Sequence, residues 1–314
     1  MSDNNIAFVF PGQGSQSIGM LAELAQAQPL IKQTFAEASE ALGKDLWQLV
    51  SSGEAAELGE THNTQPAMLA AGVAVWRVWC EQSRVRPSWM AGHSLGEYTA
   101  LVCSGAISFS DAVVLVTERG RLMQQAVPAG VGAMAAILGL DDEQVITVCA
   151  ESAQDEIVSA VNFNSVGQVV IAGNVAAVER AMIEAKQQGA KRAIKLPVSV
   201  PSHCALMESA AELLFERLQT IEISVPTVPV IHNVDVAPYN TADEIRNVLK
   251  QQLFKPVRWV DTIQFLHQQG VSHFLECGPG KVLWGLNKRI AKTAEHLTIF
   301  DTTTLKKAVE QLND

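Results

Sequence analysis

The chain has 314 residues, of which 48% are hydrophobic and 18% are charged, and its formal net charge is −10. This composition is that of an ordinary globular protein and excludes an intrinsically disordered chain. The acidic balance argues against nucleic-acid binding, which requires a positive surface.

The first part of the chain predicts buried strands that alternate with amphipathic helices. The strands are expected at 6–10 and 88–91, and the helices at 30–42, 66–80, 97–106 and 111–125. Pro66 is placed in the first turn of its helix, and Asp111 is a candidate N-cap. The first strand runs into Pro11-Gly12-Gln13-Gly14-Ser15, a composition typical of a tight turn.

Shorter elements are expected after Pro128. The strands are predicted at 134–138, 157–161, 168–172 and 193–196, and the helices at 141–151 and from a cap at Asn174 to Gln188. The order βαββαβ is that of a ferredoxin-like unit. We therefore expect a small subdomain at 127–205, inserted into a larger body made of 1–126 and 206–314.

The remainder of the chain returns to the larger body. Helices are expected at 204–219, 242–253 and 260–269, and strands at 228–232 and 274–276. Alternating strands and helices favour a parallel sheet covered on both faces. The predicted fold class is α/β, with a hydrolase-like parallel-sheet body and an inserted ferredoxin-like subdomain.

The sequence predicts no secretory signal peptide, no membrane anchor and no metal site. Met1 to Asn5 contains no basic residue, and the longest uncharged apolar-rich run, 66–76, is shorter than the roughly 20 residues that span a bilayer. The five cysteines are scattered without a Cys-x-x-Cys pair, and the seven histidines lack metal-ligand spacing. We expect a soluble, cytoplasmic monomer without metal or cofactor.

The segment Gly92-His93-Ser94-Leu95-Gly96 has the Gly-x-Ser-x-Gly pattern. In this pattern a serine sits on a sharp turn between a strand and a helix, and the helix N-terminus offers N–H groups to a developing oxyanion. The predicted strand before it and helix after it favour a catalytic serine, with a structural turn as the alternative. His93 would point away from its neighbour and fits a packing role.

Two further residues are candidates for chemistry. His203 lies between a predicted strand and helix, where a base for Ser94 would be well placed, although most histidines are structural or exposed. Arg119 lies in a predicted helix, where a solvated or ion-paired role is the usual one. Alternatively, its guanidinium binds a substrate carboxylate through two parallel hydrogen bonds.

Seven motifs, in this order and over almost the whole length, resemble the malonyl-CoA:acyl carrier protein transacylase family of type II fatty acid synthesis. They are Phe10-Pro11-Gly12-Gln13-Gly14-Ser15-Gln16, Thr64-Gln65-Pro66-Ala67, Gly92-His93-Ser94-Leu95-Gly96-Glu97-Tyr98, Arg119-Gly120, Val161-Asn162-Phe163-Asn164-Ser165, Pro201-Ser202-His203 and Glu276-Cys277-Gly278-Pro279-Gly280. The resemblance implies transfer of a malonyl group from malonyl-CoA to the thiol of acyl carrier protein.

The resemblance also implies residue roles. Ser94 would be the nucleophile and His203 its base, oriented by the backbone carbonyl of Gln252. The backbone N–H groups of Gln13 and Leu95 would form the oxyanion hole.

The substrate would be held by Arg119, which the resemblance pairs with the malonyl carboxylate. Carrier proteins are acidic, so a local basic patch is expected. The candidates are Lys186, Lys191, Arg192 and Lys195, and Lys281, Lys288 and Arg289.

Three alternatives remain at this stage. A serine esterase or lipase of the α/β-hydrolase type shares the serine turn, but would carry an acid between the serine and the histidine. A non-catalytic acyl-thioester binding protein would retain the fold without forming an acyl-enzyme. A related acyltransferase would take a branched malonyl unit. Cys204, beside His203, is interpreted as a small packing residue.

Overall fold

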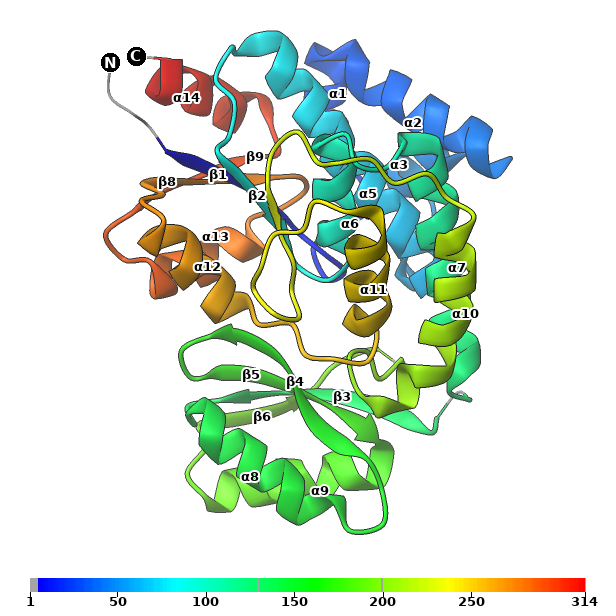
Figure 1. The fold of residues 1–314 in the computed structure, drawn as a ribbon, viewed down its shortest axis with the longest axis vertical. Coiled ribbons are helices and arrows are strands. Elements are labelled where there is room, and N and C mark those ends of the chain that lie inside the picture. The colour runs from blue at the N-terminus through cyan, green and yellow to red at the C-terminus, as the bar shows by residue number, and fades with distance from the viewer. Residues whose placement is uncertain (1–4, 129, 199, 314) are drawn as a thin grey trace.

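The computed structural model describes residues 5–128, 130–198 and 200–313. The chain forms two parts, a larger body at the top of Figure 1 and a smaller part below it, each built around its own sheet. Met1 to Asn4, on which the expectation against a signal peptide partly depends, lie outside the described residues. Across the three described ranges, no helix combines the length and hydrophobicity that a membrane crossing requires.

The sheet of the body has five parallel strands in the order β7-β2-β1-β8-β9. They are β1 (Ile6–Phe10), β2 (Trp89–Gly92), β7 (Val230–Ile231), β8 (His273–Cys277) and β9 (Glu295–Ile299). Alternate residues of β1 face opposite sides, so Phe8 joins the apolar core on one face and Val9 the core on the other. Both faces are therefore covered, as a parallel sheet requires.

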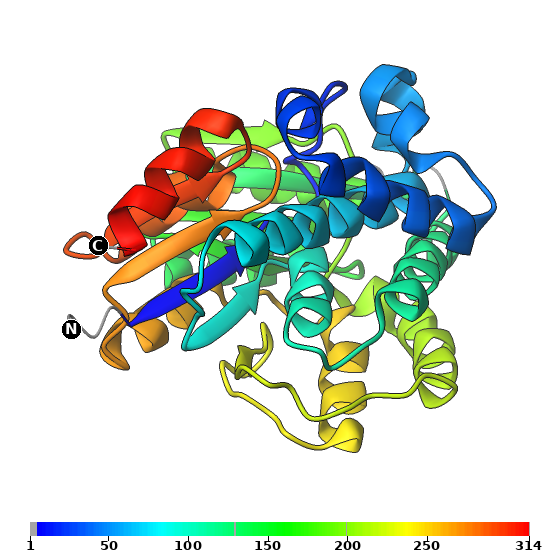
Figure 2. The ribbon, with the colours of Figure 1, turned by 90° about the horizontal axis from the view of Figure 1, so that it is seen from above.

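The helices of the body surround this sheet (Figures 1 and 2). They are α1 (Ala22–Ala27), α2 (Pro29–Leu42), α3 (Leu46–Ser52), α4 (Ala55–Gly59), α5 (Thr61–Gln82), α6 (Leu95–Cys103), α7 (Phe109–Ala126), α10 (Glu208–Gln219), α11 (Ala242–Gln252), α12 (Trp259–Gln268), α13 (Val282–Ile290) and α14 (Thr302–Asn313). A short 3-10 turn, Ala205–Met207, precedes α10.

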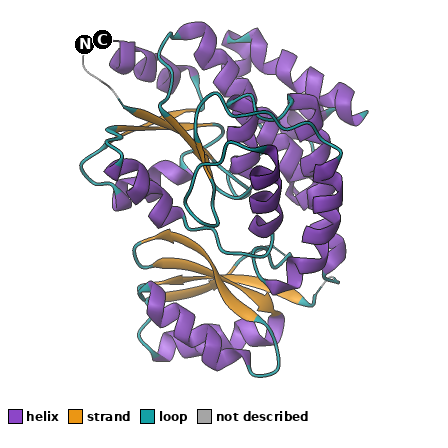
Figure 3. Cartoon of the chain, viewed as in Figure 1, coloured by secondary structure: helices purple, strands orange, loops and turns teal. Residues whose placement is uncertain are grey.

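The smaller part has the predicted βαββαβ order. Its elements are β3 (Gly132–Leu138), α8 (Asp142–Ala153), β4 (Val158–Ser165), β5 (Gln168–Asn174), α9 (Val175–Gln187) and β6 (Arg192–Lys195). The antiparallel strands follow the order β4-β5-β3-β6, which is the ferredoxin-like topology. Helices α8 and α9 cover one face, and the other face lies toward the body (Figure 3). The predicted fold class is confirmed.

A separate apolar core supports a division into two subdomains. Residues of β3, β4, β5, α8 and α9 form a cluster of their own. The parts are joined by backbone hydrogen bonds, from Phe163 N–H to the Val257 carbonyl (3.0 Å) and from Val257 N–H to the Val161 carbonyl (2.9 Å). We propose the boundaries expected from the sequence, 127–205 for the insert and 1–126 with 206–314 for the body.

Three details differ from the sequence-based expectations. Helix α5 begins at Thr61, so Pro66 lies inside it rather than in its first turn. The N-cap of α7 is Ser108, whose hydroxyl accepts the Asp111 N–H (3.1 Å), so the assignment of Asp111 as the cap is wrong. Asn174 occupies the N-cap position of α9, as predicted, but its side chain makes no capping hydrogen bond, because its amide oxygen accepts the Ile157 N–H instead (2.9 Å).

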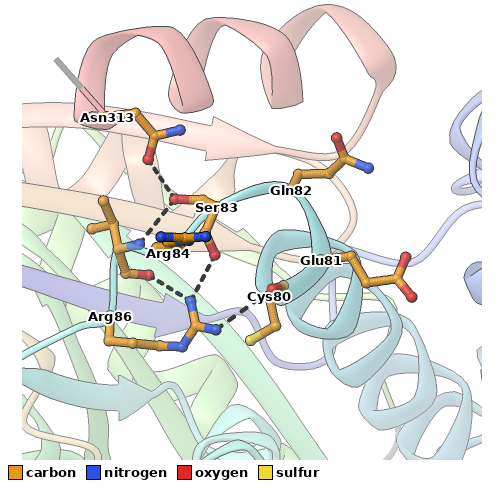
Figure 4. A pocket seen from close by; sticks show the side chains of 8 residues that line it. Cys80, Glu81, Gln82, Ser83, Arg84, Arg86 and Asn313 are labelled. Carbon is orange, nitrogen blue, oxygen red and sulfur yellow. Dashed lines mark hydrogen bonds between the residues drawn. The ribbon is translucent and has the colours of Figure 1, made fainter.

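The C-terminal helix α14 packs beside β9 and also contacts α1 (Figures 1 and 2). A hydrogen bond from the Ser83 hydroxyl to the Asn313 amide oxygen (2.7 Å) holds its end. The Arg86 guanidinium beside it donates to the Ser83 carbonyl at 2.8 Å and the Cys80 carbonyl at 3.5 Å, where α5 ends (Figure 4). Residues 80–86 and Asn313 line a surface pocket here. The pocket has a structural role, because Arg86 caps the C-terminus of α5.

Candidate active site

Three neighbouring parallel strands deliver the residues of the site. Their carboxyl ends lie at one edge of the sheet, where ligands bind in open α/β folds. Gln13 follows β1, Ser94 follows β2, and the pair His232-Asn233 follows β7. The strand order β7-β2-β1 places Ser94 between the other two.

Ser94 occupies a strained turn. Its backbone has φ 51° and ψ −108°, a conformation that non-glycine residues rarely adopt, and it stands at the N-cap position of α6. The side chain of Asn233 holds this turn, because its oxygen accepts the Ser94 N–H (2.7 Å) and its NH₂ donates to the Gly92 carbonyl (2.7 Å). The serine hydroxyl is thus presented at the start of a helix.

The glycines of the motif permit close backbone contact. A Cβ on Gly92 would lie 1.8 Å from the carbonyl carbon of Gly96, and a Cβ on Gly96 would lie 2.0 Å from the Phe10 carbonyl oxygen. Both contacts are with main chain, which cannot move aside as a flexible side chain does. The Gly-x-Ser-x-Gly pattern is therefore a steric requirement of the way α6 packs on β1 and β2.

We expect Gly92→Ala to lower the free energy of unfolding by about 3 kcal/mol or more, since the added methyl overpacks main-chain atoms. Gly285→Ala, at a position in α13 with nothing within 4 Å of the added Cβ, is the control and should stabilise by roughly 0.5–1 kcal/mol. Urea unfolding followed by circular dichroism measures both. Equal transition midpoints for the two variants would contradict the steric argument.

Ser94, His203 and Gln252 form a chain of hydrogen bonds. Ser94 Oγ lies 2.8 Å from His203 Nε2, and His203 Nδ1 lies 2.6 Å from the backbone carbonyl oxygen of Gln252. The carbonyl can only accept, so Nδ1 carries the proton and Nε2 is free to accept from the serine hydroxyl. This geometry suits a nucleophile, a base and a group that orients the base without a carboxylate.

Burial, together with the nearby positive charge of Arg119, lowers the pKa of His203 to about 3. Its side chain is 3% exposed. A histidine with such a pKa is neutral at physiological pH, which is the state in which it accepts a proton.

Arg119 is a buried cation beside the serine. It is 1% exposed, and its Nη2 donates to the Gln252 side-chain oxygen (3.0 Å) and lies 3.3 Å from Ser94 Oγ. Among the described residues no carboxylate pairs with it, and its Nε has no hydrogen-bond partner. Burying a charge without a counter-ion is costly, which favours the binding of an anion beside Arg119.

These residues line one cavity of about 200 Å³ between the two parts of the chain. Ser94, Leu95, Arg119 and Gln13 come from the body, and His203 comes from the end of the insert, where it contacts Gln252 of the body. Apolar side chains from the small part and the segment after it complete the wall: Met134, Val170, Leu196, Val198 and Val200. The cavity therefore combines a cationic end with an apolar wall.

Two backbone N–H groups suit an oxyanion. Leu95 is the first residue of α6, whose first N–H groups have no partner inside the helix. Gln13 lies in the loop after β1, and that loop packs so closely on the serine turn that a Cβ on Gly12 would lie 2.4 Å from the His93 carbonyl oxygen. Within the described ranges, neither amide donates a hydrogen bond to another residue.

The structure thus brings together all six residues singled out from the sequence, Ser94, His203, Gln252, Gln13, Leu95 and Arg119. His93 points to Asn164, with its Nε2 2.7 Å from the amide oxygen, and packs near the ring of Trp259. Sequence reasoning missed Asn233 and the buried Glu97. A polar pair directly after a strand was the available signal for Asn233.

Comparisons with known proteins point to one family. A model of the acyl transferase domain family matches residues 7–302. The malonyl CoA-acyl carrier protein transacylase of Salmonella typhimurium is 57% identical over 305 residues, covering 97% of this chain and 99% of that protein.

Solved structures give the same result. The malonyl CoA-acyl carrier protein transacylase of Coxiella burnetii superposes with a TM-score of 0.98 at 50% identity, covering 99% of this chain and 98% of that one. A malonyl-transacylase solved in complex with a type II PKS acyl-carrier protein has a TM-score of 0.97 at 57% identity, covering 98% and 99%. The chain belongs to the acyl transferase family and, within it, to the malonyl CoA-acyl carrier protein transacylases.

Proposed function

We propose that this chain transfers a malonyl group from malonyl-CoA to the thiol of an acyl carrier protein through an ester of Ser94. One observation carries the proposal: Ser94 Oγ lies within hydrogen-bonding distance of both a neutral base, His203 Nε2 at 2.8 Å, and a buried cation, Arg119 Nη2 at 3.3 Å. The first contact suits acyl transfer, and the second suits an acyl group that carries a carboxylate.

In the first half-reaction His203 Nε2 takes the proton of Ser94 Oγ as the oxygen attacks the thioester carbonyl carbon. The oxyanion of the tetrahedral intermediate accepts hydrogen bonds from the Gln13 and Leu95 N–H groups. When the intermediate collapses, the carbon–sulfur bond breaks and His203 returns the proton to the departing thiolate. Arg119 holds the malonyl carboxylate throughout.

The second half-reaction reverses these steps with a different thiol. His203 takes the proton of the carrier thiol, whose sulfur attacks the Ser94 ester. The carbon–oxygen bond then breaks, and the proton passes from His203 to Ser94 Oγ. Such a scheme has ping-pong kinetics. The family membership and the relative bound to an acyl-carrier protein support it.

Intact-protein mass spectrometry after mixing with malonyl-CoA tests the proposal. The wild type should gain the mass of one malonyl group, and Ser94→Ala should gain none, because the nucleophilic oxygen is missing. Circular dichroism controls for folding of the variant. If the wild type forms no adduct even after rapid quenching, the proposal fails. The chain would then be interpreted as an esterase or as an acyl-thioester binding protein.

A cytoplasmic location and a monomeric state belong to the same proposal. All five cysteines are free thiols in the structure, in keeping with a reducing compartment.

We place the carrier-protein contact on the basic residues of the small part. Lys191 and Arg192 are exposed and have no carboxylate partner among the described residues, whereas Lys195 pairs with Glu179 at 2.9 Å. Exposed cations of this kind attract an acidic partner.

Charge reversal in Lys191→Glu/Arg192→Glu should raise the Michaelis constant for carrier protein by about 3- to 10-fold at low salt, with loading from malonyl-CoA unchanged. The double variant Lys306→Glu/Lys307→Glu, on the exposed face of α14 at the opposite end of the molecule, is the control (Figure 1). Steady-state kinetics at two ionic strengths measure the effect. Unchanged carrier kinetics at low salt would rule this patch out.

A further inference from the structure

Behind Ser94 lies a buried carboxylate that the proposed reaction does not use. Glu97 is 0% exposed and belongs to the first turn of α6, three residues after the serine. In many helices a glutamate at this position folds back onto the N-cap N–H. Here the Ser94 N–H is taken by Asn233, and the Glu97 carboxylate turns inward instead.

The two carboxylate oxygens accept from three donors. Oε1 lies 2.7 Å from Nδ1 of His232, and Oε2 accepts the Asn233 backbone N–H (2.9 Å) and the side-chain NH₂ of Gln252 (3.0 Å). Each of these partners is itself fully buried. A buried carboxylate that accepts hydrogen bonds from several buried donors holds those donors in place.

Gln252 connects Glu97 to the base and to the cation. A carboxylate accepts only, so the NH₂ of Gln252 must face Glu97, and its side-chain oxygen must then face Arg119 (3.0 Å). The same NH₂ also donates to the Ser94 carbonyl (3.0 Å). The backbone carbonyl of this residue is the one that His203 Nδ1 contacts.

Asn233 connects Glu97 to the serine turn. Its backbone N–H is held by the carboxylate, while its side chain accepts from Ser94 N–H (2.7 Å) and donates to the Gly92 carbonyl (2.7 Å). Glu97 touches neither Ser94 Oγ nor His203, yet it contacts both residues that place them.

We propose that Glu97 is a positioning residue for acyl transfer: its carboxylate fixes Asn233 and Gln252, and through them the serine turn, the carbonyl that orients His203 and the Arg119 guanidinium. The inference rests on the proposed function, because it assigns Glu97 a part in that reaction. A displacement of about 1 Å in such an arrangement lowers a rate by about 100-fold.

The test compares Glu97→Met, which keeps the size but removes both acceptors, with Glu97→Gln, which keeps an acceptor toward Gln252 and Asn233. Rapid-quench mass spectrometry gives the rate constant for Ser94 acylation, and the amplitude of the burst gives the competent fraction. We expect Glu97→Met to lower the rate constant per competent enzyme by about 100-fold, and Glu97→Gln to restore it to within about 10-fold of wild type.

The malonyl-to-acetyl ratio is the second readout, because freeing Gln252 also releases Arg119. It should fall several-fold in Glu97→Met. The matched control is Glu276→Gln, at another buried carboxylate, 1% exposed, which accepts the Leu283 and Trp284 N–H groups at the start of α13. Loss of this carboxylate should lower stability and leave the rate per competent enzyme unchanged.

The outcomes are distinguishable. A wild type that does not load would refute the proposed function itself. If the wild type loads, two results would overturn the inference. In the first, Glu97→Met loads at the same rate per competent enzyme as the wild type. In the second, Glu276→Gln is slowed as much as Glu97→Met. If Glu97→Met does not fold, Glu97→Asp replaces it: this variant retains the charge but is shorter by one methylene, and a wild-type rate would overturn the inference as well.

Discussion

Replacement of His203 by alanine is expected to lower the rate constant for Ser94 acylation by about 10²- to 10⁴-fold, the usual contribution of a positioned general base. The Ser94 hydroxyl then has no acceptor for its proton, since the imidazole Nε2 at 2.8 Å is removed. Rapid-quench mass spectrometry with malonyl-CoA measures the rate constant.

His296→Ala is the matched control for this variant. His296 is a half-buried histidine on β9 that hydrogen-bonds the Ala291 carbonyl (2.8 Å) and lies outside the cavity. Its loss should leave acylation unchanged. Equal rates in His203→Ala and wild type would remove the base from the mechanism.

The pH dependence of the wild type gives an independent check on the base. A histidine with its ordinary pKa of about 6.5 would be only about 3% neutral at pH 5, which lowers the rate roughly 30-fold. Burial holds the pKa of His203 near 3, so the neutral form persists as the pH falls from 7.5 to 5, and acylation should change little over this range. A rate that follows a pKa near 6.5 would contradict the buried state of the imidazole.

The second large effect concerns the acyl group. Arg119→Met should lower kcat/KM for malonyl-CoA by about 10- to 150-fold, corresponding to the roughly 1.5–3 kcal/mol of a hydrogen bond to a charged group. An acetyl group lacks the carboxylate, so acetyl-CoA loading should be affected far less. Competition between the two thioesters, followed by the masses of the two acyl-enzymes, reads the ratio directly.

Arg246→Met controls for the loss of a partly buried arginine. Its guanidinium donates to the Leu218 carbonyl (3.0 Å) and the Ile221 carbonyl (2.9 Å), away from the cavity, so the malonyl-to-acetyl ratio should remain that of the wild type. An unchanged malonyl-to-acetyl ratio in Arg119→Met would show that the guanidinium does not bind the malonyl carboxylate.

Much of the site could be predicted because its chemistry is local in the chain. The serine turn depends on backbone sterics within five residues, Gly92 to Gly96, preceded by an apolar strand and followed by a helix. The βαββαβ unit was likewise predicted from local patterns, since short apolar runs indicate its strands and helix-spaced apolar residues its helices. His203 and Arg119 were candidates from their positions, with structural roles as the alternative; the resemblance favoured the catalytic roles and alone pointed to Gln252.

Of the C-terminal elements, helix α14 does carry a local signal, since its buried residues Leu305, Ala308 and Leu312 follow helical spacing. Helix α13, strand β9 and helix α14 were not predicted, and β7 has only two residues, Val230 and Ile231. The register of such a short strand depends on its pairing with β2 rather than on its own sequence. The positions of His232 and Asn233 in the fold could therefore not be predicted from the neighbouring sequence.

The local sequence determined which residues could do chemistry: an exposed serine, a histidine at an element end and an arginine on a helix. Only the tertiary structure decided how they act. It buried Arg119 with no carboxylate partner among the residues that the structure describes, and it joined Glu97, Asn233 and Gln252 behind the serine. These contacts link residues up to 155 positions apart. The strand order and helix packing that create them follow from burial of apolar surface over the whole chain, which no short segment encodes.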